Sequence, residues 1–167
     1  YPRRSGLMRA ISERIGAYMI ERMGMDPRVV PQLRRQYVQQ YGTTSRGLQL
    51  LHGLDVEDYM AYVHDLPLRE YIEPNGELDA MLAALPQEKV IFTNASAGHA
   101  HAVLLALGVA HHFERIYDAL FAGNQGKPAM QSYQKMLAEL GVPGTQCLMV
   151  DDTVRNLRPA KSLGMVT

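Results

Sequence analysis

The chain has 167 residues, 47% of them hydrophobic and 20% charged, and its 17 basic residues balance its 17 acidic ones. This length and composition predict one domain, or one with a small satellite, and exclude disorder along the whole chain. Zero net charge argues against nucleic acid or an anionic membrane as a partner, because such partners select a basic face. A small molecule is therefore the expected partner.

The sequence shows neither a signal for export nor an apolar segment long enough for membrane insertion. Cys147 is the only cysteine, so no disulfide can form within the chain. The longest apolar run, 102–110, falls well short of the roughly 20 residues of a membrane helix, and no signal segment opens the chain. We therefore expect a cytoplasmic protein. Because the chain starts at Tyr1 without methionine and stops within an apolar run, we also expect it to be part of a longer polypeptide.

The first part of the chain shows only helical patterns. Apolar residues recur every four positions from Leu7 to Met19, and Ser5 is placed to cap this helix. Asp26 followed by Pro27 predicts the start of a second helix, which runs toward 41–42. Shorter helices are predicted around 48–54 and 59–63. Together they predict a small helical bundle over residues 4–74.

After Pro74 helices and strands alternate. The pattern predicts helices at 77–85, 96–107, 129–140 and 154–163, and strands at 89–93, 116–121, 146–150 and from 165 onward. Strands separated by helices of this length pair in parallel, so residues 75–167 are predicted to form a doubly wound α/β sheet whose last strand is incomplete. Ligands of such sheets bind beyond the carboxyl ends of the strands.

A hydroxyl and exposed backbone N–H groups follow the first of these strands. Thr93, Asn94 and Ala95 stand where the next helix begins, an arrangement that suits a bound anion. The alternative is simple capping of that helix by Asn94 or Ser96, with Thr93 as the last residue of the strand. The residues at the later strand ends decide between anion binding and simple capping.

A lysine and two adjacent acids stand at those later positions. Lys127 precedes Pro128 at the start of a predicted helix, which would hold its ammonium group at the mouth of a site. Asp151 and Asp152 end an apolar strand, and adjacent carboxylates repel each other unless a cation lies beside them. Hard oxygen ligands suit Mg²⁺ rather than zinc. A solvated lysine, a capping Asp151 and a solvent-facing Asp152 are the alternatives for each residue taken alone.

The sequence predicts a pocket for phosphate and Mg²⁺, because a hydroxyl, a lysine and an acid pair stand at successive strand ends.

The sequence resembles the haloacid dehalogenase superfamily of phosphohydrolases, and within it the pyrimidine 5′-nucleotidase group with a helical cap. Segment 91–96 resembles the second motif of the superfamily, Lys127-Pro128 the third, and 150–153 with Asn156 the fourth. Segments 41–48 and 64–67 are similar to the cap of the nucleotidase group.

The resemblance implies a role for each core motif. Thr93 and the two N–H groups that follow it would hold the phosphoryl oxygens, and Lys127 would neutralise charge on nucleophile and phosphate. Asp152, supported by Asp151, would bind Mg²⁺.

Substrate choice is expected to come from the cap, because the core supplies only phosphate chemistry. Arg46 and His64 are the candidates for contacting the leaving group, with roles on the helix surface as the alternative. The resemblance implies a monomeric or dimeric Mg²⁺-dependent phosphomonoesterase that hydrolyses nucleotides, in particular pyrimidine nucleoside 5′-monophosphates, through an aspartyl-phosphate intermediate.

One motif of the superfamily is missing from the sequence. The first motif, an Asp-x-Asp-x-Thr segment just before a Tyr-Pro pair, supplies the nucleophile and the general acid/base, and here Tyr1-Pro2 opens the chain. We therefore expect this chain to be inactive and its parent to be a phosphatase. A phosphate-binding relative without catalysis is one alternative, and a dehalogenase, which needs no Mg²⁺, is a less favoured one. We also expect the chain to be marginally stable, since the absence of a central strand exposes unpaired edges.

Four histidines, at positions 99, 101, 111 and 112, also invite a metal interpretation. His99 and His101 are two residues apart on a predicted helix and so point in different directions. We expect all four to be surface residues.

Overall fold

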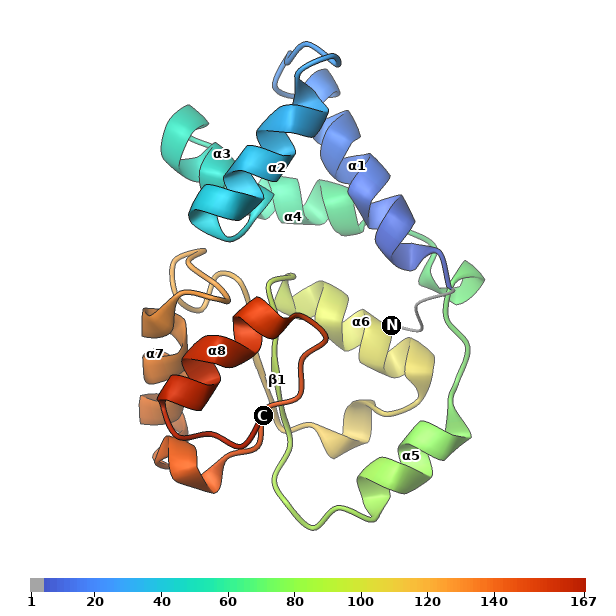
Figure 1. The fold of residues 1–167 in the computed structure, drawn as a ribbon. Coiled ribbons are helices and arrows are strands. Elements are labelled where there is room, and N and C mark those ends of the chain that lie inside the picture. Colours follow the sequence, from blue (N-terminus) through green and yellow to red (C-terminus); the bar gives the residue numbers. More distant parts are fainter. Residues whose placement is uncertain (1–4) are drawn as a thin grey trace.

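The computed structural model describes residues 5–167, and Figure 1 shows a layer of helices above an α/β unit. The helical layer consists of α1 (Leu7–Glu21), α2 (Val30–Tyr41), α3 (Thr44–His52) and α4 (Val56–His64). The 3₁₀ helix Leu68–Glu70 then leads to the α/β unit, whose elements are α5 (Gly76–Ala83), β1 (Val90–Phe92), α6 (Ala97–Leu107), the 3₁₀ helix Ala110–His112, β2 (Arg115–Tyr117), α7 (Met130–Leu140), the 3₁₀ helix Gly144–Gln146 and α8 (Val154–Ser162).

The helical layer has a core of its own, to which all four helices contribute. On α1, Met19 is fully inside this core, whereas Leu7 is fully buried against Ile72 and against Val103 of the α/β unit. Ser5 accepts the N–H of Leu7 in the first turn. The ring of Tyr18 packs edge-on against Tyr59 of α4 at 5.1 Å between centroids. The other buried members of this core include Val30, Tyr37, Leu48, Val56, Met60 and Val63. Burial of these apolar faces is what stabilises helices this short.

The start of the second helix was predicted wrongly. Asp26 opens a turn, because its carboxylate accepts the N–H of Arg28 and its carbonyl accepts the N–H of Val29. The helix begins at Val30, and Pro31 is the proline in its first turn. Proline does occupy the first turn of this helix, as it prefers to, but the residue is Pro31 and not Pro27.

The α/β class predicted for the second unit is confirmed. β1 and β2 pair in parallel, with Ile91 opposite Ile116. Ile91 and Ile116 pack with α5 and α6, whereas their neighbours in the strands, such as Phe92 and Tyr117, pack with α7 and α8. Side chains that alternate along a strand point to opposite faces, so both faces of the sheet are covered by helices, as in a doubly wound fold.

The strands are shorter than the sequence predicted. β2 ends at Tyr117 because Asp118 turns the chain, its carboxylate accepting the N–H groups of Leu120 and Phe121. The predicted strands at 146–150 and from 165 onward are reduced to one parallel bridge between Leu148 and Val166. Within residues 5–167 this bridge is not joined to the β1–β2 sheet by backbone pairing.

None of the helices described between residues 5 and 167 is both long and apolar enough to span a membrane.

Candidate functional site

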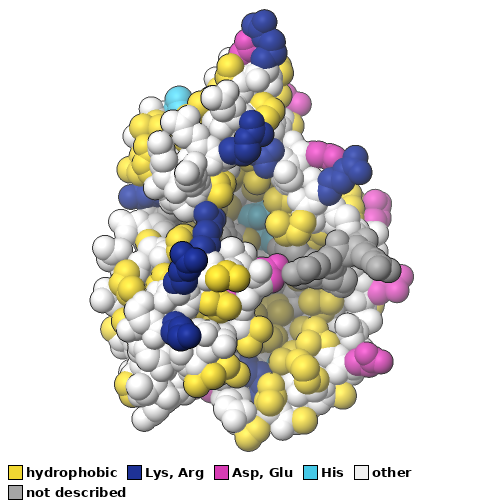
Figure 2. Space-filling view, viewed as in Figure 1, with side chains coloured by type: hydrophobic (Ala, Val, Ile, Leu, Met, Phe, Trp, Pro, Cys, Tyr) yellow, Lys and Arg dark blue, Asp and Glu magenta, His cyan; other side chains and the backbone are white. Residues whose placement is uncertain are grey.

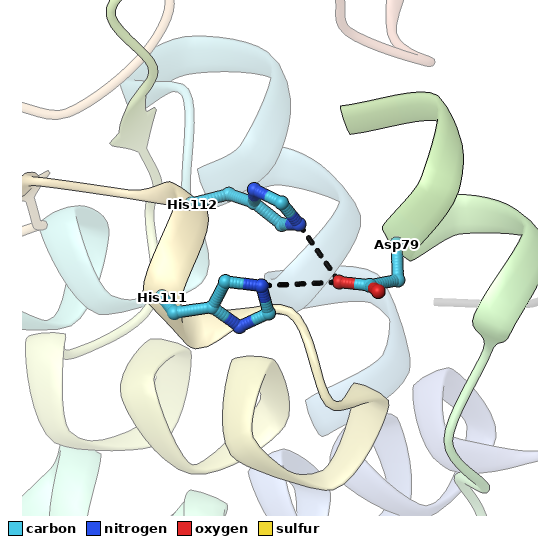
Figure 3. A group of neighbouring side chains, drawn as sticks. All are labelled: Asp79, His111 and His112. Carbon is cyan, nitrogen blue, oxygen red and sulfur yellow. Dashed lines mark hydrogen bonds and ion pairs between the residues drawn. The ribbon is translucent and has the colours of Figure 1, made fainter. Parts of the chain in front are cut away.

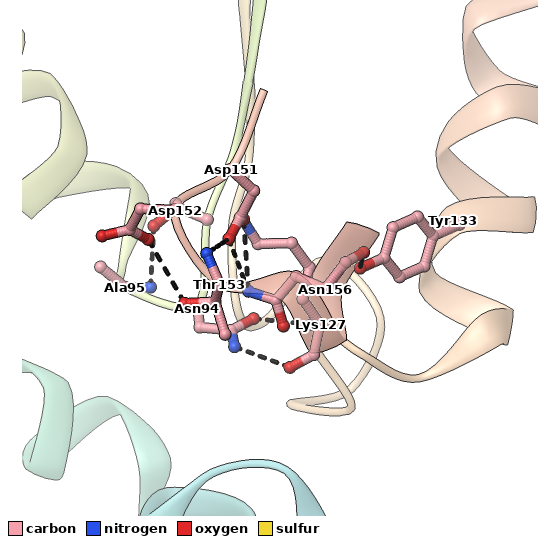
Figure 4. Close-up of polar contacts among 9 residues, drawn as sticks. Asn94, Ala95, Lys127, Tyr133, Asp151, Asp152, Thr153 and Asn156 are labelled. Carbon is pink, nitrogen blue, oxygen red and sulfur yellow. Dashed lines mark hydrogen bonds and ion pairs between the residues drawn. The ribbon is translucent and has the colours of Figure 1, made fainter. Parts of the chain in front are cut away.

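The centre of the site is an ion pair between two residues that the sequence placed at successive strand ends. Lys127 Nζ lies 2.6 Å from Asp151 Oδ2, and the two side chains are only 11% and 7% exposed. Lys127 stands in the loop before α7, and Asp151 follows the Leu148 bridge, so loops from two parts of the sheet meet here (Figure 4). The predicted proximity of Lys127 and Asp151 is therefore present in the structure.

Asp151 is surrounded by hydrogen-bond donors. Its Oδ1 accepts the N–H of Thr153 and the side-chain amide of Asn156, and its Oδ2 accepts Lys127 Nζ. Burial by itself would raise the pKa of Asp151, but the hydrogen bonds from Lys127, Thr153 and Asn156 and the charge of Lys127 outweigh it and lower the pKa below its usual value. Asp151 is therefore a carboxylate at neutral pH, and it holds the ammonium group of Lys127 in place.

Asp152 differs sharply from its neighbour. Its side chain is exposed, and its Oδ1 accepts a hydrogen bond from Thr153 Oγ1 at 3.3 Å. Within residues 5–167 it forms no ion pair. Mg²⁺ binds hard oxygen ligands, and the exposed carboxylate of Asp152 is such a ligand. The carboxylate of Asp151 beside it is buried and hydrogen-bonded, so the acid pair suits Mg²⁺ with Asp152 as the ligand.

The loop after β1 carries the hydroxyl and amides that were expected to bind phosphate. Thr93 is anchored by its backbone, since its N–H donates to Tyr117 O across the sheet. Its Oγ1 accepts the N–H of Ala95 at 3.0 Å, so this hydroxyl and this amide are paired with each other in the structure. The loop ends at Ser96, whose side chain caps α6 by accepting the N–H of His99. Capping by Ser96 is thus present, whereas β1 ends at Phe92, one residue before Thr93.

Asn94 makes two hydrogen bonds to the backbone of Lys127. Its Nδ2 donates to Lys127 O and its Oδ1 accepts Lys127 N–H, both at 2.7 Å. A Cβ on Gly126 would collide with the Asn94 carboxamide, which explains the glycine before Lys127. The side chain of Asn94 is therefore occupied in positioning Lys127, and only its backbone remains for the predicted contact with a phosphoryl oxygen.

Arg46 lies at the contact between α3 and the loop that precedes Lys127. Its Nη1 donates to Gln49 Oε1 at 2.7 Å and to Gly123 O at 3.3 Å. The buried side chain of Asn124 continues the contact, since it accepts a hydrogen bond from Ser45. Arg46 thus joins the helical layer to the loop that carries the catalytic lysine candidate.

His64, the other cap candidate, lies over the start of α6. Its ring stacks on His99 at 4.1 Å between centroids, and its Nδ1 lies 3.3 Å from Ser96 Oγ. Burial first, and the neighbouring His99 second, lower the pKa of His64 to about 4, so the ring is neutral at pH 7. His99 is buried, which contradicts the expectation that it is a surface residue.

A cavity of about 620 Å³ opens beside this stacked pair. Its lining includes Arg14, Arg22 and Asp65 from the helical layer, His64, and Ser96 of the α/β unit. Figure 2 shows the molecule hollowed at the junction of its upper and lower parts, with Lys and Arg side chains on both sides of that junction. Ser96, which ends the loop that begins at Thr93, lines the cavity, whereas Thr93 and Lys127 do not.

Sequence reasoning missed two residues that hold the site together. Arg155 of α8 reaches across to the helical layer, where it donates to Val38 O and, through a short contact, to Gly42 O. Asp118 accepts the N–H of Ala97 and so fixes the start of α6 against β2. Asp118 directly follows β2, but the sequence placed it inside a strand predicted over 116–121, so its position gave no signal.

Comparisons with known proteins agree with the motifs. The family description of haloacid dehalogenase-like hydrolases matches residues 7–164. Phosphate metabolism protein 8 of Saccharomyces cerevisiae is 27% identical over 161 residues, which cover 86% of this chain and 49% of that protein. Enolase-phosphatase E1 of Marinobacter nauticus is 29% identical over 113 residues, covering 68% of this chain and 41% of that protein. The chain spans less than half the length of these two relatives, and it belongs to the haloacid dehalogenase-like hydrolase family.

Proposed function

We propose that the chain forms the phosphate- and Mg²⁺-binding part of a phosphomonoesterase. The observation that carries the proposal is the buried Lys127–Asp151 pair with the exposed Asp152 beside it and the Thr93 loop opposite. Membership of the hydrolase family and a relative named as a phosphatase support it.

Each residue of the pocket has a task that its contacts support. A phosphate monoester would lie between Lys127 and the Thr93 loop, where the ammonium group offsets charge on the phosphoryl oxygens. The Thr93 hydroxyl and the Ala95 N–H, now paired with each other, would turn to those oxygens. Asp151 holds the ammonium group of Lys127 in position, while Asn94 fixes its backbone.

The acid pair is proposed as the Mg²⁺ site. Asp152 would be the ligand from this chain, with Asp151 in support. Bound Mg²⁺ would offset the negative charge that develops on the phosphoryl group. The exposure of Asp152 leaves its carboxylate accessible to such an ion.

The leaving group would extend into the cavity at the junction of the helical layer and the α/β unit. The cavity volume, about 620 Å³, lies in the range of small-molecule sites, and the neutral His64 ring and the cationic Arg14 would offer stacking and hydrogen bonding to a nucleoside there. We propose pyrimidine nucleoside 5′-monophosphates as substrates and the cytoplasm as location. Arg46 would act less directly, by holding the loop in front of Lys127.

The nucleophile must come from outside these residues. The sequence holds no Asp-x-Asp pair, and covalent phosphoryl transfer without a nucleophile is slower by several powers of ten. We therefore propose that residues 1–167 bind phosphate and Mg²⁺ without hydrolysing esters, and that an added segment supplies the aspartyl nucleophile.

The test is phosphate release from a panel of nucleoside monophosphates by a protein that joins an Asp-x-Asp segment of the family to residues 1–167. We expect Mg²⁺-dependent release that Lys127→Met and Asp152→Asn each reduce at least about 100-fold. The exposed Lys161→Met and Glu88→Gln serve as charge-matched controls. Halide release from a haloacid would support a dehalogenase instead. Mg²⁺ and phosphate binding with no turnover would support a phosphate-binding relative.

A further inference from the structure

A second group of metal-ligating side chains lies away from the phosphate pocket. Asp79 stands in the first turn of α5, and His111 and His112 end the 3₁₀ helix Ala110–His112 (Figure 3). The Nε2 atoms of both histidines face Asp79 Oδ1, at 3.2 Å from His111 and 2.8 Å from His112. One ligand atom from each of the three residues lies within 4.8 Å of the others.

The backbone holds this group in place from both sides. Asn75 caps α5 by accepting the N–H of Leu78, and its own N–H donates to Leu107 O at the end of α6. Beneath the cluster, α5 and the 3₁₀ helix share a core that includes Leu82, Leu104 and the 1%-exposed Val109. The three side chains therefore project from two elements whose spacing is fixed by packing.

The separations fit hydrogen bonds and also fit the ligands of a small cation. Two ligands held at 2.0–2.1 Å from a tetrahedral ion lie about 3.3 Å apart. The N···O separation from His111, 3.2 Å, is close to that value, whereas the one from His112, 2.8 Å, is shorter and has the length of an ordinary hydrogen bond. As hydrogen bonds they would direct two ring nitrogens at a single carboxylate oxygen.

We propose that Asp79, His111 and His112 form a site for Zn²⁺. Imidazole nitrogen combined with one carboxylate oxygen is a donor set for zinc and its transition-metal neighbours, whereas Mg²⁺ takes oxygen ligands. The side chain of His112 is 11% exposed, and those of Asp79 and His111 are 44% and 64% exposed, so water completes the coordination.

The place of the site indicates a structural role. His111 and His112 precede β2, whereas Thr93 follows the neighbouring parallel strand, so the cluster and the phosphate loop lie at opposite ends of the sheet. In Figure 1, α5 lies at the end of the α/β unit that is far from the helical layer. Bound Zn²⁺ would tie α5 to the segment that enters β2, and thereby stabilise the fold without entering the phosphate chemistry.

The test is calorimetric titration of the protein with Zn²⁺ in excess Mg²⁺, which keeps the Asp152 site occupied. We expect one Zn²⁺ per chain, and binding at least about 100-fold weaker in His111→Ala and in Asp79→Asn, each of which loses a ligand from an exposed position. His101→Ala removes an exposed histidine of α6 and is expected to bind like the unmodified chain.

Thermal unfolding provides the second measurement. Zn²⁺ should raise the Tm of the unmodified chain and of His101→Ala, and leave the Tm of His111→Ala unchanged. Absence of Zn²⁺ binding, or equal binding by His111→Ala and His101→Ala, would overturn the proposal. So would a Zn²⁺ affinity that falls only when Asp152 is replaced.

Discussion

Asp151 and Asp152 show how adjacent identical residues acquire different chemistry from their surroundings. Asp151 accepts hydrogen bonds from Lys127, Thr153 and Asn156, whereas Asp152 is exposed and lightly bonded. The sequence could predict the pair and its proximity to Lys127, because strand ends meet at one edge of a sheet. It could not predict that the side chain of Asn94 binds the backbone of Lys127, since that contact joins two loops 33 residues apart.

Replacing Lys127 by methionine should destabilise the fold. The substitution leaves the carboxylate of Asp151 buried without its cation, at a cost of about 3 kcal/mol in the free energy of unfolding. Urea denaturation measures it, with the exposed Lys161→Met as control. Adding Asp151→Asn to Lys127→Met should restore part of the loss. Equal stability of the Lys127 and Lys161 variants would contradict the burial argument.

The buried His64 should make stability depend on pH. Its pKa is lowered to about 4, first by burial and then by His99, whereas in the unfolded chain it titrates near 6.5. Between pH 6.5 and 4 the unfolded chain binds a proton that the folded chain does not, so the free energy of unfolding falls as pH falls through this window. Above pH 6.5 this contribution is constant.

His64→Phe keeps a ring on His99 and removes the titration. When the pH is lowered from 6.5 to 5, the free energy of unfolding of the unmodified chain should fall by up to about 2 kcal/mol more than that of His64→Phe. Chemical denaturation at both pH values measures this, and His101→Ala should behave like the unmodified chain. Parallel pH profiles for His64→Phe and the unmodified chain would rule out a neutral buried His64.

At the scale of elements, the helices were easier to predict than the strands. The stripe of α1 is set by spacing within one segment, so Leu7 and Met19 could be placed inside. β2 is three residues long because the hydrogen bonds of Asp118 turn the chain directly after it. The pattern of apolar residues in the sequence does not indicate this turn. His99 was misplaced for a similar reason: its partner, His64, belongs to another unit.

Gly47 determines how closely α3 approaches α2. A Cβ at this position would lie 2.5 Å from Cγ of Tyr37, which is itself 3% exposed and cannot move aside without disturbing the core. Gly47→Ala should lower the free energy of unfolding by about 2 kcal/mol. Gly76→Ala is the matched control, since nothing lies within 4 Å of its added Cβ in α5. Thermal or urea denaturation of both variants measures the difference, and equal stability would disprove the close approach.

At the scale of the whole molecule, the residues around the Leu148–Val166 bridge leave apolar side chains uncovered. Leu148 is 68%, Val150 87% and Val166 62% exposed. Within residues 5–167 this bridge is separate from the β1–β2 sheet. Figure 2 shows hydrophobic side chains gathered on one face of the lower part of the molecule.

Val150→Lys should therefore reduce self-association. Uncovered apolar strands favour contact between copies, and a lysine on such a strand opposes it. Sedimentation over a range of concentrations should show association of the unmodified chain and a shift toward monomer in Val150→Lys. Val29→Lys, on the helical layer, is the control. A monomeric unmodified chain at all concentrations would contradict this prediction.

The central claim, that the strand ends form one pocket for phosphate and Mg²⁺, is tested most directly by titrating the chain with inorganic phosphate. We predict binding that requires Mg²⁺, persists in Glu88→Gln and is at least about 10-fold weaker in Asp152→Asn. Phosphate binding that is the same with and without Mg²⁺, or unchanged in Asp152→Asn, would contradict the account.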